Sequence, residues 1–217
     1  MNKEHLVRRL VQYALGLFVM ALGVVLMKRA DLGISPITCV PAAISNVTPI
    51  TLGNLTIMLH AVCTIIQCIL MRRVSLYNVL TMAVGFPFGY IIDGLMLVIK
   101  LEGAPMWLRC LALLAALACS GMGIHLMVGS DLMMPAPDGL SHTISQTFHK
   151  KLSNVKVCSD AVYVATSVVL DLIFMGRIVT AGLGTVASVL LVGRFVGLFG
   201  KVFPQAKMAP FWPVKKA

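Results

Sequence analysis

The chain has 217 residues, of which 59% are hydrophobic and 12% charged, and its mean hydropathy is +0.92. A soluble domain would carry about twice this share of charge, so the long apolar runs indicate a chain whose solvent is lipid. In a soluble protein the net charge of +10 would suggest nucleic acid. Here the basic residues stand between the apolar runs, where membrane topology explains them, so we expect the lipid bilayer and no nucleic acid as partner.

The first apolar run, residues 10–27, follows a basic start and so resembles a signal peptide. It is long enough to span a membrane, and Lys28-Arg29 follows it instead of a cleavage site with small residues. We therefore interpret it as the first span.

Six apolar segments are long enough, or nearly so, to cross a hydrocarbon core of about 30 Å. A short polar linker with helix-breaking residues, 100–105, separates the first three from the last three. The expected fold is an all-α integral membrane protein with two three-span units, residues 1–100 and 101–217. The segments run roughly over residues 10–28, 54–71, 77–99, 106–128, 156–174 and 178–200.

Residues 23–54 recur at 123–154 without a gap, at an offset of one hundred residues. Apolar identities mean little in such a chain, but shared Asp, Ser and Asn positions at one offset are hard to obtain by chance. We infer two copies of one unit. The identical pairs are Gly23/Gly123, Leu26/Leu126, Met27/Met127, Asp31/Asp131, Leu32/Leu132, Ile44/Ile144, Ser45/Ser145, Leu52/Leu152 and Asn54/Asn154.

Orientation follows from Lys and Arg. With both termini in the cytoplasm, 12 of the 18 basic residues fall inside, 5 fall outside and Arg194 lies within a span. Three spans per unit is an odd number, so the second unit enters from the opposite side, as in the inverted repeats of many secondary transporters. The five outside are Lys28, Arg29, Lys100, Arg109 and Arg177.

Each copy breaks its helical pattern after the first span, at 31–36 and again at 131–137, where Gly and Pro residues interrupt it. The segments that follow, 35–46 and 137–146, are too short to span and too apolar for ordinary loops. They predict re-entrant or interfacial half-helices. Irregular backbone at membrane depth survives only inside protein or against a water-filled cavity, so we expect both turns to face inward, one from each side.

The N-terminus of a short helix offers free N–H groups and a positive dipole end, which suit an anion. The acid before each half-helix could accept a proton, a cation or an amine, or it could cap local N–H groups; the repeated pair leaves both interpretations open. Ser45/Ser145 and Asn54/Asn154 are more typical of helix stops and caps. The candidate solute-binding residues are Asp31, Ser35 and Thr38 in copy one and Asp131, Asp138, Ser141 and His142 in copy two.

Charges within spans are costly and need partners. Asp93, in the third span, and Arg194, in the sixth, lie near opposite faces in the predicted topology, so we do not expect them to pair with each other. Each would instead hold or gate the half-helix on its own side, unless both side chains snorkel to the interface. The expected partners are Lys28 or Arg29 for Asp93, and Asp131 or Asp138 for Arg194.

The remaining polar groups in spans predict little chemistry. His60 and His125 are expected to be satisfied core hydrogen bonders, with a proton relay as the lesser alternative. Asp160 and Asp171, near the two ends of the fifth span, could simply reach headgroups or water. The 6 cysteines show no CxxC pair and no Cys/His ligand spacing, so we expect neither a metal site nor a cofactor.

No HExxH, P-loop, GxGxxG or nucleophile elbow stands in a fitting context, so we expect no enzyme. Intramembrane catalysis that uses the repeated Asp31 and Asp131 remains the alternative.

The sequence ADLGISP at 30–36, followed by AIS at 43–45 and TLGN at 51–54, resembles the YczE/YitT-like family of bacterial integral membrane proteins. The likeness covers most of the chain but rests on that one turn motif. It implies a protein of the bacterial cytoplasmic membrane, often labelled a transporter, and it supplies no catalytic residues. That family often carries Trp-Asp after the proline, where this chain has Ile37-Thr38; Asp138 is the candidate equivalent in the second copy.

We therefore expect a small secondary transporter or exporter. It would bind a small polar or anionic solute near the midplane, between the two inverted units, with H⁺ or Na⁺ as candidate coupling ions. The alternatives are a non-transporting scaffold or a subunit that binds lipid or a partner, and then a passive channel, for which polar residues are too few. A chain of only six spans is compatible with a homodimer.

Overall fold

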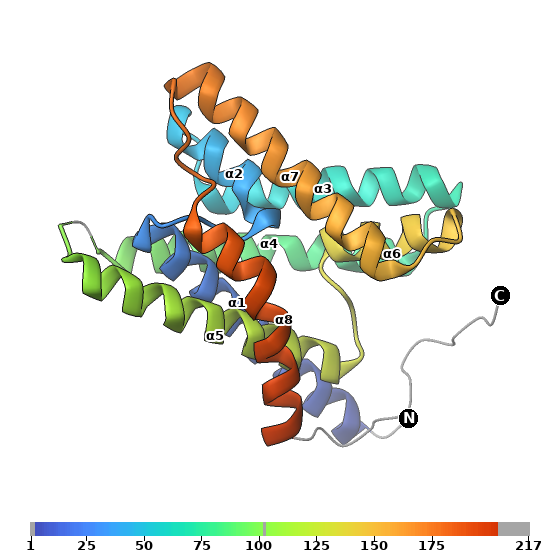
Figure 1. The fold of residues 1–217 in the computed structure, drawn as a ribbon. Helices are drawn as coiled ribbons and strands as arrows, with labels where there is room; N and C mark the ends of the chain where they lie inside the picture. The colour runs from blue at the N-terminus through green and yellow to red at the C-terminus, as the bar shows by residue number, and fades with distance from the viewer. Residues whose placement is uncertain (1–2, 102, 204–217) are drawn as a thin grey trace.

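The computed structural model describes residues 3–101 and 103–203, and within these ranges the chain is helical and has no strand. Figure 1 shows α1, α5 and α8 in the lower part of the view, α2, α3, α6 and α7 in the upper part, and α4 between them. The helices are α1 (Lys3–Ala30), α2 (Pro36–Val47), α3 (Leu52–Met71), α4 (Leu76–Val98), α5 (Met106–Ser130), α6 (Ala136–Thr147), α7 (Leu152–Met175) and α8 (Leu183–Val202).

Six of these helices are long and apolar enough to cross a membrane, which indicates a multi-pass membrane protein. They are α1, α3, α4, α5, α7 and α8, and they correspond to the six predicted spans. Most bounds agree within a few residues; α1 and α7 begin earlier than expected, and α8 begins later, because residues 176–182 form a loop. The short helices α2 and α6 have 12 residues each.

The helices break where the turn motifs predicted, and they do so in the same way twice. Asp31 and Asp131, which end α1 and α5, adopt left-handed φ angles of 53° and 52°. Left-handed backbone is uncommon outside glycine, but Asp and Asn tolerate it best. A proline then starts each short helix, Pro36 at the first position of α2 and Pro135 just before α6.

The centre of the molecule is the antiparallel pair of α1 and α5. At one end Gln12 donates from Nε2 to the carbonyl of Leu126, 3.2 Å away. At the other end Arg109 donates from Nε to the carbonyl of Ala30, 2.7 Å away. The two helices therefore pack along nearly their whole length and support the turns that follow both of them.

Glycines bring this pair unusually close. A Cβ at Gly16 would lie 3.0 Å from the carbonyl oxygen of Gly123, and a Cβ at Gly23 would lie 2.9 Å from the carbonyl oxygen of Ala116. Small residues at such crossings let backbones approach, and in lipid this packing is a main source of helix association. Glycine is required at these positions for space.

The short helices pack across the molecule onto the other half of the chain. α2 lies against α7, and α6 lies against α3. Gln67 of α3 donates from Nε2 to the carbonyl of Ala136 at the start of α6, 2.9 Å away. Cys63 of α3 and Tyr163 of α7 meet where the two halves join, with Sγ and Oη 3.5 Å apart. The two halves are thus interlocked.

Candidate functional site

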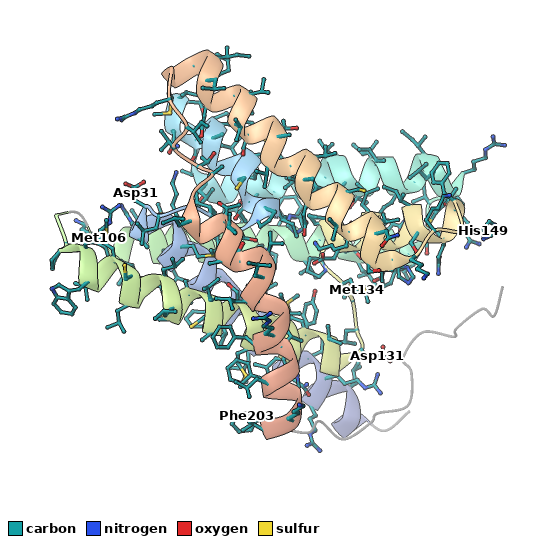
Figure 2. All side chains as sticks on the ribbon, in the orientation of Figure 1. Asp31, Met106, Asp131, Met134, His149 and Phe203 are labelled. Carbon is teal, nitrogen blue, oxygen red and sulfur yellow. The ribbon has the colours of Figure 1, made fainter. Side chains whose placement is uncertain are left out.

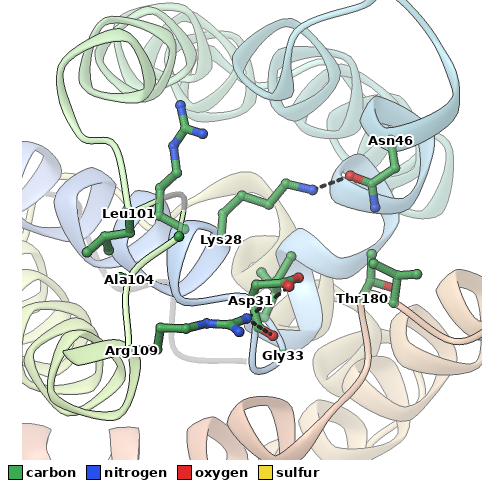
Figure 3. A pocket seen from close by; sticks show the side chains of 12 residues that line it. Lys28, Asp31, Gly33, Asn46, Leu101, Ala104, Arg109 and Thr180 are labelled. Atoms are coloured by element: carbon green, nitrogen blue, oxygen red, sulfur yellow. Dashed lines mark hydrogen bonds and ion pairs between the residues drawn. The ribbon is translucent and has the colours of Figure 1, made fainter. Parts of the chain in front are cut away.

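A half-enclosed cavity of about 400 Å³ opens at the C-terminal end of α1. It lies between the two halves of the chain, because its walls come from the α1–α2 region, the α4–α5 linker, the start of α5 and the α7–α8 loop (Figure 3). Its volume falls in the range of small-molecule sites. The lining residues are Lys28, Arg29, Asp31, Gly33, Ile34, Asn46, Leu101, Gly103, Ala104, Arg109, Val179 and Thr180.

The described lining of the cavity is rich in cationic side chains. Lys28, Arg29 and Arg109 line it together with Asp31. Arg109 donates from Nη2 to Oδ2 of Asp31, 2.9 Å away, and to the main-chain oxygen of Asp31, 3.0 Å away. The cations stand at the C-terminus of α1, where the negative end of the helix dipole stabilises them.

Lys28 and Arg29 both donate to neutral oxygen atoms, which help to hold their side chains in place. Lys28 donates from Nζ to Oδ1 of Asn46, near the end of α2, at 2.5 Å. Arg29 donates from Nη2 to the carbonyl of Met96 in α4, also at 2.5 Å. Lys28 is in electrostatic range of both Asp31 and Asp171. A small anion entering the cavity would therefore meet the positioned cationic donors Lys28 and Arg109.

One wall of the cavity is the loop between α7 and α8, and Asp171 of α7 holds the shape of this loop. Oδ2 of Asp171 accepts from the backbone N–H of Val179 at 2.9 Å, from the backbone N–H of Thr180 at 2.7 Å and from Oγ1 of Thr180 at 2.7 Å. Both loop residues line the cavity. One buried carboxylate oxygen thus fixes the position of this wall.

The same loop is joined to the first turn by main-chain hydrogen bonds. The N–H of Ile34 donates to the carbonyl of Thr180 at 3.1 Å, and the N–H of Gly184 donates to the carbonyl of Leu32 at 2.7 Å. Gly33, at a φ of 117°, packs against the backbone of Gly182 so closely that neither position has room for a Cβ. Opening the cavity on this side would require these contacts to break together.

Of the predicted solute-binding residues, the structure places only Asp31 in the cavity. Ser35 and Thr38 follow it on α2 but do not line the cavity: Thr38 is buried and donates from Oγ1 to the carbonyl of Ser35 at 3.0 Å. Ser35 stands at the N-cap position of α2, before Pro36, but its side chain makes no cap hydrogen bond. Arg29, predicted as a gating charge, does line the cavity.

The second-copy candidates lie elsewhere. Asp131 is exposed at the far end of α5, and Figure 2 shows it well away from Asp31. Asp138 pairs with Lys156 of α7 at 2.6 Å, and Ser141 is buried and donates to the carbonyl of Pro137 at 3.3 Å. His142 is half-buried on α6. The structure therefore does not bring the two turns to one cavity.

The expected ion pair between Asp93 and Lys28 is wrong. Asp93 instead caps α3, accepting from Oγ1 of Thr51 at 2.6 Å and from the N–H of Gly53 at 2.8 Å. The start of a helix offers free N–H groups and a positive dipole end, so this carboxylate is stabilised without a cation.

The expected pair of Arg194 with Asp138 is also wrong, because Asp138 pairs with Lys156. Arg194 itself is exposed on α8. Its surface position agrees better with the alternative that its side chain snorkels toward the interface.

The histidines behave as predicted for core hydrogen bonders. His60 is buried with Nδ1 2.8 Å from the carbonyl of Thr56, and Nε2 of His125 lies 3.1 Å from the carbonyl of Phe203. Asp160 does not simply reach headgroups, because its Oδ1 lies 3.2 Å from Nζ of Lys156. In the part of the chain that the structure describes, no group of three or more His, Cys, Asp or Glu could hold a metal ion.

Three positions at or behind the cavity were missed from the sequence: Lys28 and Arg109 as cavity cations, and Asp171 as the buried carboxylate behind the wall. The prediction that Asp171 reaches water or headgroups is wrong, since the residue is 1% exposed. One signal was present. Lys28, Arg29 and Arg109 are among the few basic residues that the predicted orientation places outside, against the positive-inside pattern, and such exceptions need a reason of their own.

Comparison with known proteins identifies a family whose function is not known. The model of a family described as a family of unknown function, DUF6198, matches residues 7–201. The chain belongs to this family. The matched range of this DUF6198 protein runs from early in α1 to near the end of α8 and includes every cavity residue. No curated protein and no solved structure matches it, so the YczE/YitT-like resemblance remains an expectation from the turn motif.

Proposed function

We propose that this protein is a small secondary transporter for a small anionic solute, in a bacterial cell membrane with both termini in the cytoplasm. The observation that carries the proposal is the cavity between the two halves, whose described lining includes the cations Lys28, Arg29 and Arg109. A cavity of this size, polar and half-enclosed, suits reversible binding of a solute. A scaffold, by contrast, would need a dry interface between the two halves.

The inverted repeat is part of the proposal, and two kinds of contact support it. First, α1 and α5 are equivalent helices at an offset of one hundred residues, and they run antiparallel. Second, a contact between two positions recurs between their equivalents, with the two halves of the chain swapped. Gly16 meets Gly123 while Gly23 meets Ala116, as expected if a two-fold axis swaps the halves.

The same swapped pairing of equivalent positions is found at the short helices. Gln67 of α3 lies beside Gly139 of α6, and the equivalent positions, Ser167 of α7 and Cys39 of α2, lie beside each other. α2 and α6, at 12 residues each, reach only about 18 Å at the helical rise per residue. That length is short of a span and fits re-entrant half-helices that enter from opposite sides.

Alternating access follows from this arrangement. In the proposed orientation the described cavity faces outward, next to the Asp31 turn. The Asp131 turn would border the equivalent inward cavity after one half rocks against the other. Three of the five basic residues predicted outside line the outward cavity, so anion binding explains why they depart from the positive-inside pattern.

Transport is tested with the purified full chain in liposomes, using counterflow of labelled sulfate and of small mono- and dicarboxylates. We expect at least one anion to exchange, and Lys28→Gln to reduce its flux at least tenfold. Lys150→Gln, which removes an exposed cation from the other end of the molecule, is the matched control and should leave flux unchanged. Wild-type protein that exchanges none of these anions would overturn the proposal.

The two turn acids test the site assignment separately. Under alternating access, Asp31→Asn and Asp131→Asn should both reduce flux, because each turn borders the cavity in one of the two states. If both variants exchange anions at the wild-type rate, transport would stand but the turns would not be part of its pathway.

A further inference from the structure

Arg9 of α1 is buried, whereas its neighbour in the sequence, Arg8, is exposed. Arg9 is only 7% exposed, and both residues fall on the cytoplasmic side of the predicted orientation. A basic residue that only sets topology needs to reach headgroups or water, as Arg8 can. Burial of a guanidinium within a span is costly, and such residues commonly serve a function. Arg9 therefore needs a reason beyond topology.

The register of α1 against α5 places Arg9 at the end of α5. Gly16 packs on Gly123 in this antiparallel pair. Arg9 precedes Gly16 by about two helical turns, and Ser130 follows Gly123 by the same length, so Arg9 and Ser130 lie at one level. Arg109 reaches the end of α1 in the same way, with the two halves swapped. The offset of one hundred residues that relates the two turns thus also relates Arg9 to Arg109.

A buried hydroxyl lies one turn further along the same face of α1. Tyr13 is 6% exposed, and within the described part of the chain its Oη has no hydrogen-bond partner. Positions four apart share a helix face, so Arg9 and Tyr13 stand on one side of α1. Tyr13 belongs to the same buried cluster as Leu132, the residue after Asp131. An unsatisfied buried hydroxyl is costly, and a bound oxygen ligand would remove that cost.

The second turn is held in place by a side chain, whereas the first turn is held by main chain. The N–H of Met134 donates to Oη of Tyr77 at the start of α4, 3.1 Å away. The equivalent N–H, that of Ile34, donates to the carbonyl of Thr180 in the cavity wall. Rotation of the Tyr77 side chain would release the Met134 contact without any change in the backbone of α4.

We propose that Arg9 and Tyr13 form the anion-binding site of the inward-facing state, for a small oxyanion such as a carboxylate or sulfate. The inference rests on the proposed inverted-repeat transporter and deepens it, because it names residues of the second state and the class of solute. A guanidinium presents paired N–H groups that match two oxygens of an oxyanion, and the tyrosine hydroxyl adds another donor. Arg109 supplies the same group to the outward cavity, so the solute meets one arginine on each side.

Sided exchange tests the assignment. Arg9→Gln and the matched control Arg8→Gln remove the same charge from adjacent positions, one buried and one exposed. Exchange of labelled sulfate or succinate, whichever wild type exchanges faster, is measured in right-side-out and inside-out vesicles with saturating anion on the opposite side.

We expect Arg9→Gln to raise the KM at the cytoplasmic face about tenfold or more, because a charge-assisted hydrogen bond is lost there. The KM at the outer face should change little, and Arg8→Gln should resemble wild type at both faces. Equal effects of the two variants, or of Arg9→Gln at the two faces, would overturn the inference.

Tyr13→Phe keeps the packed ring and removes only the hydroxyl. Within the described residues no hydrogen bond is lost, so thermal stability in detergent should not fall. The KM at the cytoplasmic face should nevertheless rise about threefold or more, as for the loss of one hydrogen bond to the solute. A hydroxyl with a merely structural role would leave that KM unchanged, which would contradict the assignment.

A second readout needs no transport. Phenylglyoxal modifies accessible arginines, and mass spectrometry of the full chain treated in detergent locates the modified ones. Arg8 should react under all conditions. Arg9 should react when the inward end opens, and sulfate or succinate should protect it, whereas chloride at equal ionic strength should not. Tyr13→Phe should weaken this protection, and Arg109→Gln should not.

The two readouts separate the two proposals. If Arg9 never reacts, or reacts equally with and without these oxyanions, the inference fails even where transport holds. Protection of Arg9 without exchange of either anion would leave the second anion site standing and overturn transport alone.

Discussion

Arg109 shows how one side chain can order a turn and still leave charge for a ligand. It donates to the main-chain oxygens of Ala30 and Asp31 and to the Asp31 carboxylate. The Asp31 side chain is 66% exposed, so the ion pair itself adds at most about 1 kcal/mol of stability. The value of Arg109 lies in its position: a fixed guanidinium at the edge of a cavity that already holds two other cations.

At this scale we predict that Arg109→Gln weakens sulfate binding about tenfold or more. A hydrogen bond to a charged group contributes about 1.5–3 kcal/mol, and about 1.4 kcal/mol corresponds to a factor of ten in affinity. Titration of the purified protein with sulfate measures the effect. Arg177→Gln, which removes an exposed arginine from the same end of the molecule, should change the affinity little; equal losses in both variants would mean that only overall charge matters.

The decisive element is the α1–α5 pair, because both turns and one wall of the cavity depend on it. Backbone atoms make many of its closest contacts, so there is little room for adjustment. A Cβ at Gly123 would lie 2.7 Å from the backbone nitrogen of Met20 and 2.8 Å from the carbonyl oxygen of Gly16. These neighbours cannot move aside as a flexible side chain would.

We therefore expect Gly123→Ala to destabilise the protein by about 1–3 kcal/mol, the usual cost of overpacking. Thermal unfolding in detergent should show a clearly lower Tm. Gly193→Ala on α8 is the matched control, since nothing lies within 4 Å of its Cβ position and alanine favours helix. A Gly123→Ala protein as stable as wild type would mean that the helices do not cross this closely in the membrane.

For the whole molecule, the central prediction is that equivalent positions of the two halves face opposite sides of the membrane. Ile50 and Lys150 are exposed loop positions one hundred residues apart. A membrane-impermeant thiol reagent should label Ile50→Cys in intact cells and Lys150→Cys only after permeabilisation, each measured above the signal of the unsubstituted chain. Val74→Cys, exposed in the α3–α4 loop, should behave like Lys150→Cys. Labelling of Ile50→Cys and Lys150→Cys from the same side would exclude inverted repeats.

The sequence was most informative where local rules apply. Hydropathy and length predicted the six long helices, since backbone groups in lipid must be satisfied within a segment. The Asp, Gly and Pro residues of the two turns predicted where α1 and α5 end, because these residues act on their own backbone. Asp31, which lines the cavity, was reached by the same local argument.

The partners of charged groups could not be predicted in this way. Asp93 was expected to need a cation, but the start of α3 lies beside it and supplies an N–H and a hydroxyl instead. Asp171 was expected to reach water, but the loop that follows α7 folds back over it. Both errors arose because the neutralising donors come from a segment whose approach depends on helix packing.

The sequence by itself therefore determined the helical spans, the two broken turns and the excess of positive charge, since each depends on residues close together in the chain. Only the tertiary structure decided which charges share a cavity. Lys28, Arg109 and Thr180 meet because α1 and α5 cross at their glycines and the α7–α8 loop packs onto Gly33. Contacts between segments so far apart in sequence arise from the fit of whole helices, which no local pattern encodes.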